Sequence, residues 1–401
     1  DFFGVDSFSY LATTNDGRSS GPATVLLEVT PMQDAPIGVE DAYTTSPGQP
    51  INLDGHEYVY WTDTRSDQLS RMIADGGAIE PLAEFDSVSQ ARDVIWSSTE
   101  NKLYWLDRGD RAIYRASRDG DDMERVVADL IEPVGLALNE ANGTLYWADS
   151  ARGAIYRTNT IGNDPPEPVI VDLHRPVAVA YDAQRARIVW ADGDTGLIES
   201  MNRDGSDRRS IDAGLRAPVD MLVRGSSILV SDSVLGTIEQ VNMNSGTSET
   251  LVANVPGVRG IALSQNSNVL MWTDIYSQSI QQTDLTKGHT ETLVGELASP
   301  WGVAWVPAES VLTNDRNVDR ISLIGELVDG PERGTLQWAA NGAFTYEPNI
   351  GYVGRDEFTY RPVGAVPGNL TRVVLNVVAD ADLNQDGRVD AADAAELAMD
   401  W

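Results

Sequence analysis

A short apolar segment that ends in aspartate recurs six times along this chain. The copies read VYWTD, LYWLD, LYWAD, IVWAD, ILVSD and LMWTD, and they end at Asp63, Asp107, Asp149, Asp192, Asp232 and Asp274. Successive aspartates are 44, 42, 43, 40 and 42 residues apart. A repeat of this length is typical of the four-stranded blades of a β-propeller. The sequence therefore predicts a mainly β protein that contains a six-bladed β-propeller.

The remainder of each period supplies the other strands of a blade. After the aspartate come turn residues and a second strand, such as AIYRASRDG at 112–120, and then a third strand, such as RVVAD. A nearly continuous apolar segment such as PVGLAL follows, as expected for an inner strand that neighbouring blades cover on both faces. The segment PWGVAW at 300–305 has no blade of its own. We expect it to complete the first blade and close the ring.

These motifs resemble the YWTD propeller of the low-density lipoprotein receptor family over residues 56–308. The copies YWTD, YWLD, YWAD and MWTD carry the resemblance, VWAD is weaker, and LVSD is identified mainly by its spacing. The resemblance implies a propeller that binds without catalysis, often at the mouth of its central channel. The motif tryptophans are expected to pack between blades rather than to contact a ligand. They are Trp61, Trp105, Trp147, Trp190 and Trp272.

A second duplication lies outside the propeller. FFGVDSFSY at 2–10 and YVGRDEFTY at 352–360 share the frame G-x-D-x-F-x-Y, and each precedes a β-rich segment. We interpret 1–30 as the C-terminal part of one β-domain and 31–55 plus 309–380 as a second, discontinuous one, with about 100 residues in an immunoglobulin-like sandwich. The sequences of these segments resemble the cadherin-like repeats of large bacterial surface proteins. The propeller would then be inserted into a loop of one repeat, and the chain would be a fragment of a longer protein.

The C-terminal segment 381–401 contains the pattern of a calcium-binding loop. Oxygen side chains at loop positions 1, 3, 5, 9 and 12, a glycine at 6 and a carbonyl at 7 are what a seven-coordinate calcium ion requires. The predicted ligands are Asp382, Asn384, Asp386, Arg388 through its carbonyl, Asp390 and Asp393. The turn TNDRNVD, with Asn314, Asp315 and Asp319, is a weaker calcium candidate, and a hydrogen-bonded turn is the alternative.

The same segment resembles a dockerin repeat, because Asp393 replaces the usual glutamate and AADAAELAMDW has a helical pattern. We therefore expect a short α-helical, EF-hand-like C-terminus, and the resemblance implies a cohesin as partner. A dockerin needs two loops and only one is present, so the loop is either single or truncated. An acidic tail that fits by chance is the remaining alternative.

Charge and cysteine content restrict the partners and the compartment. The formal net charge of −32 makes nucleic acid and anionic membranes unfavourable partners. The absence of cysteine argues for a bacterial extracellular protein stiffened by calcium rather than a disulfide-rich ectodomain. No apolar run is long enough to span a membrane. We expect the protein to be secreted or attached to the cell surface.

Catalytic patterns are few. The three histidines, His56, His174 and His289, lie in different blades, and no G-x-S-x-G, P-loop or dinucleotide fingerprint occurs. Some six-bladed propellers are lactonases that hold a metal with carboxylates and an asparagine at the channel mouth. Asp93 and Asp220 would lie there, but no matching glutamate and asparagine accompany them. A lactonase or related hydrolase remains an alternative.

The candidate ligand-binding residues come from aligning the inner strands on DVIW, GLAL, AVAY, DMLV, GIAL and GVAW. One rim position then holds Arg92, Val134, Val177, Val219, Arg259 and Trp301. Arginine and tryptophan dominate binding hot spots, whereas the three valines are what packing alone would select. Asp93 and Asp220 follow at the next position, and Tyr276 lies in the loop after the sixth motif. Alternatively, the arginines form salt bridges with Asp93 and Asp220, and Trp301 only fills the closing blade.

These observations predict a non-catalytic extracellular binding or adhesion protein. The propeller would be the recognition head, with a protein or glycan ligand at its channel mouth, and the cadherin-like repeats would be the stalk. A component of a polysaccharide-degrading assembly, attached through its dockerin-like end, is the runner-up.

Overall fold

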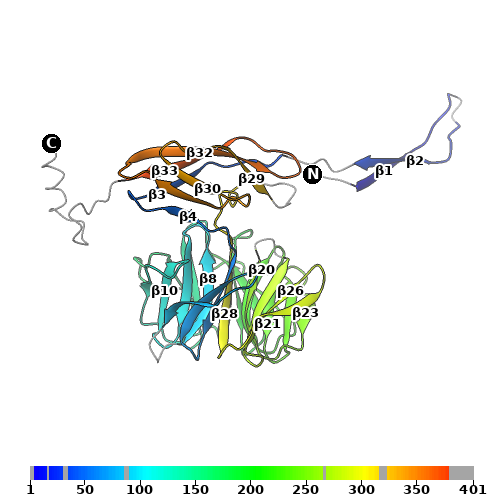
Figure 1. The fold of residues 1–401 in the computed structure, drawn as a ribbon. Helices are drawn as coiled ribbons and strands as arrows, with labels where there is room; N and C mark the ends of the chain where they lie inside the picture. Colours follow the sequence, from blue (N-terminus) through cyan, green and yellow to red (C-terminus); the bar gives the residue numbers. More distant parts are fainter. Residues whose placement is uncertain are drawn as a thin grey trace. The chain divides into compact units, whose positions relative to one another are not determined.

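The computed structural model describes residues 4–15, 18–29, 35–84, 90–264, 268–315 and 323–378. These ranges contain β-strands, turns and bends but no α-helix. The chain divides into two compact units, His56–Pro307 and the remainder, Asp1–Gly55 with Ala308–Trp401 (Figure 1). The predicted mainly β class is confirmed. The predicted C-terminal helix and calcium loop lie outside the described residues.

The unit His56–Pro307 is a β-propeller of six four-stranded antiparallel sheets. Five blades run in chain order from the inner to the outer strand. They are β8 (Ala91–Ser97), β9 (Lys102–Asp107), β10 (Ala112–Ser117) and β11 (Glu124–Val127); β12 (Pro133–Asn139), β13 (Thr144–Asp149), β14 (Ala154–Asn159) and β15 (Glu167–Ile170); β16 (Pro176–Asp182), β17 (Arg187–Asp192), β18 (Ile198–Asn202) and β19 (Arg209–Ile211); β20 (Pro218–Arg224), β21 (Ser227–Asp232), β22 (Thr237–Asn242) and β23 (Ser248–Ala253); and β24 (Val258–Leu263), β25 (Val269–Asp274), β26 (Ser279–Asp284) and β27 (His289–Val294).

The remaining blade closes the ring with strands from both ends of the unit. Its order is β28 (Pro300–Val306), β5 (Tyr58–Asp63), β6 (Gln68–Ile73) and β7 (Glu80–Glu84). In its first pair, Pro300 lies opposite Asp63 and Val306 opposite Tyr58. The segment at 300–305 therefore completes the first blade, as the order of motifs predicts, and no inner edge is left open.

The propeller core is built from the repeated motif. All five motif tryptophans are at most 1% exposed, which confirms that they pack inside rather than at a ligand. Trp147, for example, packs with Tyr104 and Leu106 of the preceding blade. The ring of Tyr156 stacks on the Trp147 ring with centroids 5.7 Å apart. Aromatic burial between adjacent blades thus stabilises the closed ring.

The motif aspartates position the loops at one end of the propeller. In Asp63, Oδ1 accepts hydrogen bonds from the backbone N–H groups of Arg65 and Ser66, in the turn after its strand. Its Oδ2 accepts from Ala298 and Ser299, in the loop before the inner strand. Asp232 makes the same two pairs of bonds in its own blade. These buried carboxylates are structural, because they satisfy loop N–H groups that would otherwise lack partners.

The second unit contains a β-sandwich. One sheet has the order β29 (Ile324–Asp329), β32 (Gly354–Val363), β33 (Thr371–Val377) and β3 (Asp41–Thr45), and the other β30 (Gly334–Trp338), β31 (Phe344–Pro348) and β4 (Ile51–Leu53). The short strands β3 and β4 precede the propeller in sequence but pair with β33 and β31, which follow it. Their side chains share one core with Phe344, Tyr346, Phe358 and Tyr360.

A separate hairpin repeats two strands of this sandwich. β1 (Gly4–Tyr10) pairs antiparallel with β2 (Ala23–Val29), with Gly4 opposite Val29 and Tyr10 opposite Ala23. In the sandwich, the matching glycine of β32 likewise lies opposite the last valine of β33. The duplicated frame G-x-D-x-F-x-Y therefore corresponds to the same strand register in both copies.

Candidate binding site at the channel mouth

Each inner strand of the propeller begins with a β-bulge. The pairing register shifts between the first paired residue of the strand and the next paired residue, for example between Pro133 and Gly135 or between Pro300 and Val303. The residues between them are unpaired. A bulge redirects the side chain of the unpaired residue. The unpaired positions include the residues that the sequence alignment places at one rim position, namely Arg92, Val134, Val177, Val219, Arg259 and Trp301.

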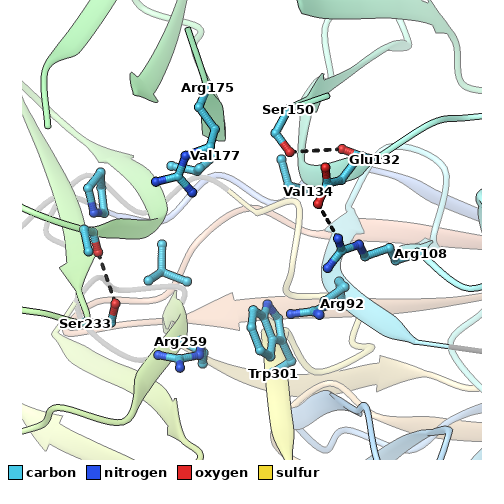
Figure 2. Close-up of a pocket in the computed structure, with 13 residues that line it drawn as sticks. Arg92, Arg108, Glu132, Val134, Ser150, Arg175, Val177, Ser233, Arg259 and Trp301 are labelled. Carbon is cyan, nitrogen blue, oxygen red and sulfur yellow. Dashed lines mark hydrogen bonds and ion pairs between the residues drawn. The ribbon is translucent and has the colours of Figure 1, made fainter. Parts of the chain in front are cut away.

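All six of these residues line one cavity of about 350 Å³ at this end of the ring (Figure 2). The neighbouring loops contribute Arg108, Glu132, Ser150, Arg175, Ala217, Pro218 and Ser233. Sequence reasoning missed Arg108 and Arg175. Arg108 directly follows a motif aspartate, and Arg175 directly precedes an inner strand, so an alignment of these loops would have found both.

Trp301 lies between two guanidinium groups (Figure 2). The Arg92 guanidinium carbon is 3.6 Å from the centre of the indole ring and that of Arg259 is 5.0 Å from it. The two arginines come from β8 and β24, which flank β28 on its two sides. Each contact is a cation–π interaction. The three side chains therefore form a continuous group across three blades, which we call the Arg–Trp–Arg cluster.

The two arginines of the cluster are incompletely hydrogen-bonded. The Nε atoms of Arg92 and Arg259 are buried and have no partner within the part of the chain that the structure describes. Arg259 Nη1 donates to the Val258 carbonyl at 2.7 Å. Burial, together with the positive charges of Arg108 and Arg259, lowers the pKa of Arg92 to about 10, and the charge of Glu132 opposes this shift. Burial also lowers the pKa of Arg259. Both side chains remain cationic at neutral pH, at an electrostatic cost.

The other charges of the cavity are paired. Arg108 forms an ion pair with Glu132, and Arg175 Nε lies 2.6 Å from Asp194 Oδ1. Arg175 also donates to the Gly193 carbonyl. Among the described residues, four arginines and one glutamate thus line the cavity, in a chain whose formal net charge is −32. The cavity is a local concentration of positive charge in an acidic protein.

Asp93 and Asp220 are not among the residues that line this cavity, which corrects their predicted position at its rim. Asp93 Oδ2 accepts a hydrogen bond from Leu136 N at 2.7 Å, and Asp220 Oδ2 accepts one from Ile261 N at 2.8 Å. Each carboxylate therefore connects its inner strand to that of the next blade. Burial raises the pKa of both groups, and the charge of Asp220 raises that of Asp93 further.

The alternative salt bridges are also absent. Among the described residues, no ion pair joins Arg92 to Asp93 or Arg259 to Asp220, because the carboxylates accept backbone N–H groups instead. Tyr276 lies in the loop after the sixth motif and is 71% exposed. It does not line the cavity.

Hydroxyl groups on the motif strands hold the backbone of the cluster. Ser231 Oγ donates to the Arg259 carbonyl at 2.7 Å, and Thr273 and Thr62 donate likewise to the Trp301 and Arg92 carbonyls. Each hydroxyl also accepts an N–H from the bulge of its own blade. In the other three motifs this position is Leu106, Ala148 or Ala191, and the rim residue of the following blade is valine. Sequence reasoning missed this correspondence, although both positions can be aligned.

The predicted metal ligands belong to two other segments of the sequence, the loop 382–393 and the turn TNDRNVD. Asp382, Asn384, Asp386, Arg388, Asp390 and Asp393 all lie outside the described residues, as does Asp319. Asp315 accepts hydrogen bonds from Val39 N and from the Tyr360 hydroxyl, as in the hydrogen-bonded turn named above as its alternative role. In the described part of the chain, no group of three or more His, Cys, Asp or Glu side chains is placed to hold a metal ion.

Comparisons with known proteins agree with this architecture. Residues 302–362 match the family described as bacterial Ig domain. A chain of the nidogen/laminin complex superposes with a TM-score of 0.56 at 18% identity, over 62% of this chain and 98% of its own. TolB from Acinetobacter baumannii superposes with a TM-score of 0.53 at 12% identity, over 64% of this chain and 68% of its own. No protein of curated function matches the sequence.

The chain thus combines a β-propeller with a β-sandwich, and part of the sandwich matches a bacterial Ig domain. Within the described residues, we find no helix with the length and apolarity needed to cross a membrane.

Proposed function

We propose that this chain is a non-catalytic extracellular binding protein, whose propeller binds a protein or glycan ligand in the cavity at its channel mouth. The Arg–Trp–Arg cluster is the observation that carries the proposal. It places hot-spot residue types beside a concave space, on inner strands whose bulges are held by hydrogen bonds. A nidogen chain of similar fold is found in complex with laminin, which supports a binding role for this type of propeller.

We further propose that the immunoglobulin-like domain belongs to a cadherin-like stalk, and that the loop 382–393 binds calcium, or binds a cohesin as part of a polysaccharide-degrading assembly. The donor set supports calcium, because five side chains at the ligand positions of this loop offer oxygen atoms. Secretion or cell-surface attachment is part of the same proposal.

The binding proposal is tested with Trp301→Ala in the full chain, presented to arrays of glycans and to displayed short random peptides. We expect this substitution to weaken the selected interaction by about 2 kcal/mol or more, as for a hot-spot residue. Arg208→Gln is a matched control, because Arg208 also lies over a tryptophan, Trp190, but does not line the cavity. Ligands that bind Trp301→Ala as well as the unchanged chain would contradict a site at the channel mouth.

A further inference from the structure

We propose that the ligand of this cavity is an acidic segment of a partner protein, whose Asp or Glu carboxylate is bound by Arg92 and Arg259 beside Trp301. This inference rests on the proposed function and specifies the chemistry of the ligand. It follows from the hydrogen-bonding state of the arginines, from the covered faces of the tryptophan and from the apolar wall opposite.

The first argument is that two of the four arginines in the cavity have side-chain N–H donors that no carboxylate binds. Arg108 and Arg175 are neutralised by Glu132 and Asp194. The Arg92 side chain has no hydrogen bond or ion pair among the described residues, and the side-chain hydrogen bond of Arg259 goes to a neutral carbonyl. A guanidinium carries five N–H donors and suits two-point binding of a carboxylate. The chain has 61 acidic residues, and among those that the structure describes Glu132 is the one that lines the cavity.

The second argument is electrostatic. The charges of Arg108 and Arg259 act unfavourably on Arg92, with a smaller opposing effect from Glu132, and burial removes part of the water that would screen them. An anion in the cavity would offset this repulsion and complete the hydrogen bonding of both arginines. Cations in a low-dielectric site bind anions more strongly than exposed cations do, since they are already partly dehydrated.

The third argument distinguishes a peptide from an acidic glycan. A sugar ring packs its C–H groups against an open aromatic face, but guanidinium groups cover the Trp301 ring at 3.6 and 5.0 Å. The inner strands across the cavity contribute Val134, Val177 and Val219, which form an apolar wall. A cavity of about 350 Å³ is near the lower limit for ligand pockets and admits only one or two side chains. An acidic residue next to an aliphatic one would present its carboxylate to the arginines and its aliphatic side chain to the valine wall.

The test uses the full chain and displayed short random peptides, with enriched sequences resynthesised for calorimetry. We expect enriched peptides to contain Asp or Glu beside an aliphatic residue. Replacing that acid by its amide should reduce affinity about tenfold or more, since a charge-assisted pair is lost. Arg92→Gln and Arg259→Gln should each have a similar effect, and affinity should fall as salt rises. Arg92→Lys keeps the charge but not the two-point geometry, so its affinity should lie between those of the unchanged chain and Arg92→Gln.

Arg208→Gln is again the control and should leave the affinity unchanged, and thermal unfolding checks that each variant is folded. Peptides that require Trp301 but show no preference for an acid would overturn the ligand class and leave the proposed function standing. Acidic glycans that bind in an Arg92-dependent manner, with no peptide enriched, would replace the peptide by a glycan. Peptides that bind every variant equally, or no ligand in either library, would overturn both proposals.

Discussion

Thr62, Ser231 and Thr273 show how one hydroxyl group can connect two blades. Each accepts an N–H from the bulge of its own blade and donates to the carbonyl of a cluster residue in the next. The bulge N–H is taken out of the strand ladder, so without the hydroxyl it would be buried and unpaired.

The hydroxyl connection predicts the effect of Thr273→Val, which keeps the shape of the side chain and removes the hydroxyl. The Gly260 N–H and the Trp301 carbonyl would lose a partner. We expect a loss of about 1–3 kcal/mol in the free energy of unfolding and faster amide exchange at Gly260. Thr273→Ser retains the hydroxyl and should behave like the unchanged chain in denaturant titration. Equal stability of the valine and serine variants would show that the hydrogen bonds contribute nothing.

Asp41 of the sandwich is a second residue with a specific consequence. Burial, together with the charge of Asp315, raises its pKa from 3.8 to about 7, against the opposing effect of a hydrogen bond from Asn314. In the unfolded chain the carboxyl has its ordinary pKa. Between about pH 4 and pH 7 the folded state therefore holds a proton that the unfolded state lacks, so stability falls as pH rises through this window.

The pH effect is checked with Asp41→Asn, which can still accept the hydrogen bond from Asn314. At pH 8 this substitution should stabilise the sandwich by on the order of 2 kcal/mol, and at pH 4 it should have little effect. Amide exchange in β3, measured across this range, reports on this unit alone. A variant whose exchange rates show the same pH dependence as those of the unchanged chain would contradict the assignment to Asp41.

At the level of elements, the same strand motif has different environments in its two copies. Phe358 and Tyr360 of β32 are at most 1% exposed, whereas Phe8 and Tyr10 of β1 are 53% and 51% exposed. The register of the two hairpins is the same. Alternation along a strand therefore predicts which side chains share a face, but a second sheet decides whether that face is buried.

The calcium loop is the other element with a direct test. Isothermal titration of calcium into the full chain should show binding at 382–393 with a dissociation constant of about 10⁻⁴ to 10⁻³ M, as in extracellular modules. Asp386→Ala should abolish it, because a carboxylate ligand is lost. Asp315→Asn is a control outside this loop and should leave the affinity unchanged. Binding that survives Asp386→Ala would place the ion elsewhere.

At the level of the whole molecule, the sandwich is assembled from segments on both sides of the propeller. β3 and β4 come before His56, and all their partner strands come after Pro307. We predict that replacing residues 56–307 by a short flexible linker leaves a folded β-domain, since the core of Phe344, Phe358 and Leu375 contains no propeller residue. Circular dichroism and amide exchange check this. A linked sandwich that is unfolded, while the excised propeller folds, would contradict an independent domain.

The sequence by itself determined the repeated architecture. Strand alternation, turn residues and a motif of fixed spacing are local signals, and they sufficed for six blades, for closure by the segment at 300–305 and for the buried tryptophans. The alignment of inner strands also brought Arg92, Arg259 and Trp301 to one rim.

Only the tertiary structure decided the directions of side chains and what surrounds them. It turned Asp93 and Asp220 to backbone N–H groups of neighbouring blades, placed two guanidiniums over Trp301, and added Arg108 and Arg175 to the cavity. These contacts join residues of different blades through bulged strands, whose side-chain directions depart from regular alternation. They become defined only when the ring closes and sets the distance from each inner strand to the next.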